Sequence, residues 1–141
     1  MRIVADTNVL ISALFWRKQL AEIADLINER KVVLCFSPET IDELYRVANY
    51  PHIARKAQEF SVNPNVLLGD VITFSLIVHP SLSISVVTDD PSDNMFLACA
   101  LAAQASFIIS GDQHLLNLKR FHNIPILTPH QFLIHLKKKR S

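Results

Sequence analysis

Short apolar runs alternate with helical segments along this chain, and few folds accommodate that alternation. The apolar runs lack turn residues and predict strands at 2–5, 31–36, 84–87, 107–110 and 125–127. Helical spacing and helix-start signals predict helical segments at 9–14, 19–30, 38–49, 52–60, 65–78, 95–105, 113–118 and from 128 onward. We therefore expect an α/β fold, a three-layer sandwich with helices on both faces of a mostly parallel sheet.

Composition narrows the class of protein further. Half of the 141 residues are hydrophobic, which suffices for one domain spanning residues 1–141. The only two glycines, Gly69 and Gly111, cannot form a dinucleotide-binding or P-loop motif. Cys35 and Cys99 lack metal-ligand spacing and indicate buried thiols in a reducing compartment. Neither a signal peptide nor a membrane segment is predicted, so we expect a cytoplasmic protein.

Carboxylates bracket the stretch from Thr88 to Asp112. Three of them, Asp89, Asp90 and Asp93, precede an apolar helical segment, and Asp112 follows the next strand. Acids at a helix start and at the carboxyl end of a strand can meet at the edge of the sheet where open α/β folds bind ligands.

Helix capping is the alternative explanation for these acids. Asp90 fits an N-cap, with Pro91 at the first helical position and Asp93 at the third. Local structure does not require Asp112, nor the Asp6 that ends the first strand. The pattern therefore favours an acidic site over capping alone.

Charge is distributed unevenly along the chain. The segment 57–118 contains 6 acids and no Lys or Arg, whereas 8 basic residues precede it and 6 follow it. An acidic centre with basic flanks suits a metal site that acts on a polyanion. Candidate phosphate contacts are Arg17, Lys18, Lys119, Arg120 and the basic tail at 137–141, although a terminal charge run can equally be a solvated end.

Four segments together resemble the PIN-domain family, and in particular its small single-domain branch of toxins from toxin-antitoxin pairs. They read IVADTNVLISAL, SPETIDELYRV, DDPSDNMFLACALAAQASFIISGD and IPILTPHQFL, and they span residues 2–133. The resemblance implies a metal-dependent endoribonuclease that hydrolyses RNA phosphodiester bonds with one or two Mg²⁺ or Mn²⁺ ions. It also implies a separately encoded antitoxin partner and a homodimer.

The resemblance also implies which residues form the site. The catalytic and metal-binding acids would be Asp6, Glu43, Asp93 and Asp112. Residues that position these acids or the substrate would be Thr7, Asn8, Asp90 and Ser110. The choice of Glu43 depends on the resemblance alone, because helical periodicity does not separate it from Glu39 and Asp42.

The residue types suit this chemistry independently. Carboxylates held close together repel one another and must take up protons or bind cations, and their hard oxygen atoms suit Mg²⁺ or Mn²⁺. The histidines are scattered and none is needed as a nucleophile, so the sequence predicts no metal or acid–base role for them; His114 is the best-placed exception because it closely follows Asp112.

Other functions remain open at the level of sequence. A module with the same fold and an idle site could bind RNA or a protein, and convergence of all four acids would argue against it. A phosphoacceptor signalling domain is disfavoured, since only Asp6 follows the first strand and no Lys follows the run 107–110. Phe15 and Trp16 could stack on a base or form a subunit interface.

Overall fold

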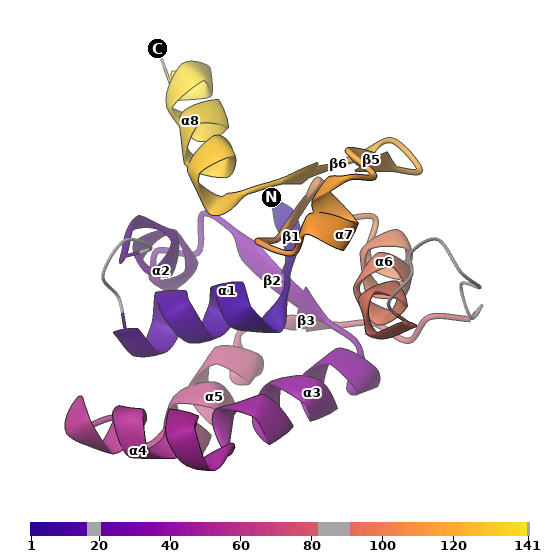
Figure 1. Ribbon diagram of the computed structural model, residues 1–141. Coiled ribbons are helices and arrows are strands. Elements are labelled where there is room, and N and C mark those ends of the chain that lie inside the picture. Colours follow the sequence, from indigo (N-terminus) through magenta and orange to yellow (C-terminus); the bar gives the residue numbers. More distant parts are fainter. Residues whose placement is uncertain (17–20, 82–90, 141) are drawn as a thin grey trace.

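The computed structural model describes residues 1–16, 21–81 and 91–140, and a largely parallel sheet runs through its centre (Figure 1). The strands are β1 Arg2–Ala5, β2 Val33–Phe36, β3 Leu76–Ile77, β4 Phe107–Ile109, β5 Arg120–Phe121 and β6 Ile124–Leu127. Their order in the sheet is β3-β2-β1-β4-β6-β5, and every neighbouring pair is parallel except β5 and β6. The predicted α/β fold with a mostly parallel sheet is confirmed.

Helices cover both faces of this sheet. They are α1 Thr7–Ile11, the π-helical turn η1 Ser12–Trp16 that continues it, α2 Ala21–Asn28, α3 Pro38–Ala48, α4 Pro51–Glu59, α5 Pro64–Thr73, α6 Pro91–Ala103, α7 Gln113–Leu116 and α8 Pro129–Arg140. Alternate residues of one strand serve the two faces, because side chains along a strand point to opposite sides. Ile3 packs in the core under α1, α2, α3 and α8, whereas Val4 packs in the core under α6 and α7.

The carboxyl ends of the parallel strands meet at one edge of the sheet, and helices begin there directly. Asp6 follows β1 and caps α1, and Ser37 follows β2 and caps α3 through a capping box with Thr40. Ser110 and Asp112 follow β4, the central neighbour of β1. The topology therefore gathers the strand-end residues of distant segments.

Two short strands differ from the predictions. The helix predicted over 65–78 ends at Thr73, and Leu76–Ile77 instead pairs with Cys35 and Phe36 at the sheet edge. The strand β5 was not predicted. It pairs with β6 around a tight turn in which His122 and Asn123 both have positive φ, of 48° and 65°.

Several other predictions can be compared with the structure. The strand predicted at 84–87 lies outside the described residues. Both cysteines are buried and free, as expected, and burial raises the pKa of the Cys99 thiol to about 12. Among the helices that the structure describes, none has the length and apolar character needed to cross a membrane.

Candidate metal centre

All four acids selected from the sequence line one cleft of about 370 Å³ at the carboxyl edge of the sheet. The polar side chains that line it include Asp6, Thr7, Asn8, Glu43, Ser92, Asp93 and Asp112. They come from the end of β1, from α1, α3 and α6, and from the turn after β4. Segments far apart in the sequence thus contribute one carboxylate each.

Asp6 is held rigidly at the base of the cleft. Its side chain is almost fully buried, with 7% of the residue exposed. One carboxylate oxygen, Oδ1, accepts a hydrogen bond from the Val9 backbone N–H at 2.9 Å, which caps α1. The other, Oδ2, accepts from the Ser110 hydroxyl and from the Gly111 N–H. These bonds tie the end of β1 to the end of β4.

Ser110 links two of the acids. Its hydroxyl donates to Asp6, and its Oγ also accepts a hydrogen bond of 2.9 Å from the backbone N–H of Asp112. Asp112 in turn caps α7, because its Oδ1 accepts from the His114 N–H at 2.8 Å. The side chain of Asp112 remains 35% exposed, so this carboxylate lies at the open side of the cleft.

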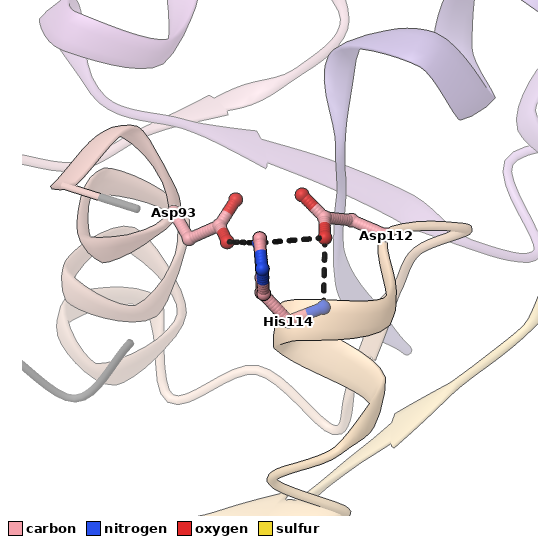
Figure 2. A group of neighbouring side chains, drawn as sticks. All are labelled: Asp93, Asp112 and His114. Carbon is pink, nitrogen blue, oxygen red and sulfur yellow. Dashed lines mark hydrogen bonds and ion pairs between the residues drawn. The ribbon is translucent and has the colours of Figure 1, made fainter. Parts of the chain in front are cut away.

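Asp93 and Asp112 face each other with the His114 ring between them (Figure 2). His114 Nδ1 lies 4.0 Å from Asp93 Oδ2 and 3.6 Å from Asp112 Oδ1. One potential ligand atom from each of the three side chains lies within 4.8 Å of the others. The sequence indicated the proximity of His114 to Asp112 but not its proximity to Asp93, which comes from a different helix.

Glu43 enters the cleft from α3. Its Oε2 accepts a hydrogen bond of 2.8 Å from the Thr7 hydroxyl, and its side chain is only 16% exposed. Glu39 and Asp42 on the same helix are exposed. The guanidinium of Arg46 lies 4.0 Å from Oε1 at the helix surface.

The electrostatics of the cleft favour a bound cation. The pKa of the Asp6 carboxyl lies above its ordinary value, mainly because this group is buried. Hydrogen bonds from Ser110, Val9 and Gly111 oppose this rise, and the charge on Asp112 adds to it. A divalent cation would remove the repulsion, and carboxylate oxygens suit Mg²⁺ or Mn²⁺. The donor set of this chain therefore fits a divalent metal.

The remaining residues predicted near the site either lie outside the described residues or do not line the cleft. Asp89, Asp90, Arg17 and Lys18 lie outside the described residues. The lining of the cleft does not include Lys119, Arg120 or Lys137. The Nζ atom of Lys137 instead lies 3.8 Å from Oε2 of Glu22 on α2.

The aromatic residues also differ from expectation. Phe15 is buried in the core and so is not available for base stacking, while Trp16 packs on Phe60 with ring centroids 5.4 Å apart. Tyr50 and His52 line the cleft, although the sequence did not single them out. They lie in the cleft because the fold places the junction of α3 and α4 beside the acids, which local sequence signals do not reveal.

A largely parallel sheet with carboxylates at its carboxyl edge is typical of α/β proteins that bind a ligand at that edge. A family model described as the PIN domain matches residues 2–114, and the chain therefore belongs to the PIN-domain family. The resemblance found in the sequence is confirmed.

One solved structure supports the fold. It is the crystal structure of VapBC2 from Rickettsia felis bound to a DNA fragment from their promoter, with a TM-score of 0.56 and 14% identity. The alignment covers 89% of this chain and 97% of that chain. No curated protein matches the sequence.

Proposed function

We propose that this protein is a Mg²⁺- or Mn²⁺-dependent endoribonuclease, formed by a single domain, and the toxin of a toxin-antitoxin pair. The observation that carries the proposal is the convergence of four carboxylates from four separate segments on one cleft. Membership of the PIN-domain family supports it, as does the structural likeness to a VapBC2 complex. The antitoxin would be encoded separately, and we propose a cytoplasmic homodimer.

Asp93, Asp112 and His114 would hold one ion, and Asp6 and Glu43 would complete the acidic lining of the same cleft. A divalent ion there would supply charge neutralisation at the phosphate and a lowered pKa for an attacking water. The chain's own residues position the acids: Ser110 orients Asp6, and Thr7 orients Glu43. Asn8, which is exposed in the same cleft, can donate a hydrogen bond to a phosphate oxygen.

The competing function was a catalytically idle module that binds RNA or a protein partner. It predicts that at least one acid falls outside the cluster, since the loss of one carboxylate ligand weakens metal binding. All four acids line the cleft, which favours the enzyme.

Cleavage of a mixed pool of structured and single-stranded RNA tests the proposal. We expect cutting in Mg²⁺ or Mn²⁺, none in EDTA, and none by an Asp6→Asn, Asp93→Asn double variant. Asp70→Asn, which changes an exposed acid on α5 outside this cleft, should cut as the wild type does. Equal inactivity of the wild type and the double variant across all RNAs and both metals would contradict the proposal and favour the idle module.

Metal binding should also raise the melting temperature. A ligand that binds only the folded state stabilises it by about 2.7 kcal/mol at a hundred times its Kd. Because imidazole is a better ligand for Mn²⁺ than for Mg²⁺, His114→Asn should reduce the shift produced by Mn²⁺ more than the shift produced by Mg²⁺. Thermal unfolding across a titration of each metal measures both effects, with His130→Asn on the exposed start of α8 as a matched control. Identical melting curves with and without millimolar metal would count against a metal site.

A further inference from the structure

Two aromatic rings stand at the rim of the cleft that holds the acids. Tyr50 joins α3 to α4 and is 40% exposed, and His52 in the first turn of α4 is exposed as well. Their ring centroids lie 6.1 Å apart with an interplanar angle of 34°. Both line the same cleft as Glu43 and Asp112, so one molecule bound in the cleft can contact the acids and the two rings.

The helix start does not need the Tyr50 side chain. Tyr50 occupies the N-cap position of α4, but its side chain makes no capping hydrogen bond. Partly buried Val47 and Ile53 also line the cleft, so its lining combines apolar and aromatic side chains with acidic ones. A nucleic acid has groups that match both kinds of lining. Its phosphates suit metal-loaded carboxylates, and its bases suit aromatic rings.

Basic side chains lie on the two helices, α3 and α4, that meet at Tyr50. Arg46 near the end of α3 is 62% exposed, and Arg55 and Lys56 on α4 are also exposed. Such residues attract the phosphates of a polyanion. The charge of these side chains therefore suits a polyanion, and the aromatic rings suit the bases of a nucleic acid.

We propose, resting on the proposed function, that Tyr50 and His52 bind an unpaired nucleobase adjacent to the phosphate held at the acids. A base in a duplex is already stacked on both faces and is not free to lie on the rings, whereas a base in a single strand is. Contact between these two rings and a base would therefore distinguish an unpaired strand from a duplex.

Fluorescence anisotropy with a labelled 12-nucleotide RNA tests this inference. The strand is used alone and annealed to its complement, with Ca²⁺ in place of Mg²⁺ and a gel to check that the RNA stays intact. Base stacking is worth roughly a five- to a hundredfold change in affinity on alanine substitution. We expect Tyr50→Ala and His52→Ala to weaken binding of the single strand within that range, and to leave duplex binding unchanged.

Two further variants separate stacking from other causes. Tyr50→Phe keeps the ring and should bind the single strand within twofold of wild type. Phe74→Ala removes a 64% exposed aromatic ring that lines a different cleft and should have no effect. Melting temperatures of all variants show whether each remains folded.

The outcomes distinguish this inference from the proposed function. Wild-type affinity in both alanine variants, an equal loss for the duplex, or a loss in Tyr50→Phe as large as in Tyr50→Ala would each overturn the inference and leave the nuclease standing. A wild type that binds the single strand through Tyr50 but cuts no RNA in Mg²⁺ or Mn²⁺ would overturn the nuclease and leave the inference standing. A wild type that binds no single strand overturns the inference.

Discussion

Replacing Asp112 with Asn is expected to reduce RNA cleavage by at least about a hundredfold, since even residues that only support metal ligands cost roughly 10- to 100-fold when mutated. The fold should remain intact. The Asn side-chain oxygen can still accept the hydrogen bond from the His114 N–H that caps α7, and repulsion from Asp93 and Asp6 is relieved. Without metal, the variant should therefore melt at the same temperature as wild type or higher.

Asp6→Asn provides the comparison for this prediction. It should lose activity to a similar extent but be less stable than Asp112→Asn by about 1–2 kcal/mol, because an amide NH₂ would face a backbone N–H that now donates to a carboxylate oxygen. Initial rates in Mn²⁺ and metal-free thermal unfolding measure the two effects. A large fall in the metal-free melting temperature of Asp112→Asn would mean that this acid is structural.

The stability of the metal-free protein should decrease as pH rises above the ordinary range of a carboxyl. Burial raises the pKa of Asp6 in the folded state above the ordinary value of 3.8, so folding favours the protonated form. The resulting stabilisation is complete below 3.8 and is lost as the pH rises through the raised pKa. Each pKa unit corresponds to about 1.4 kcal/mol.

Melting temperatures from pH 4 to 8 in EDTA, compared between wild type and Asp6→Asn, isolate this contribution. The variant should lack the downward trend because it has no proton to release at this position. In Mn²⁺ the trend should reverse for the wild type, since the metal binds ionised carboxylates and its affinity rises with pH. A difference between the two proteins that stays constant across this range would exclude Asp6 as the titrating group.

Local signals in the sequence predicted most of the fold. Strand β1 and helix α3 follow directly from an apolar run and from the Ser37-Pro38 helix start, and both lie within a residue or two of their predicted bounds. The edge strand β3 was missed because its two residues form a strand only through pairing with β2. The hairpin of β5 was missed because its turn uses positive φ at His122 and Asn123 without a glycine.

Some residues of the candidate site could likewise be selected from local sequence signals, and others could not. Asp6 and Asp112 could be selected from their positions at strand ends, and the structure has both there. Glu43 could not be selected by periodicity, because what distinguishes it from Glu39 is a hydrogen bond to Thr7, 36 residues away. The proximity of His114 to Asp93, and of Tyr50 to the acids, likewise depends on how separate helices are placed.

The central position of β4 in the sheet determines when the cleft can form during synthesis of the chain. This strand lies between β1 and β6 in the sheet, yet it and the following Asp112 belong to the last third of the chain. An N-terminal fragment ending before β4 has neither the Ser110 hydroxyl that orients Asp6 nor the carboxylate of Asp112. A chain emerging from the ribosome therefore lacks a complete cluster until Asp112 has been synthesised. On the proposed function, the enzyme cannot cut RNA before that point of translation.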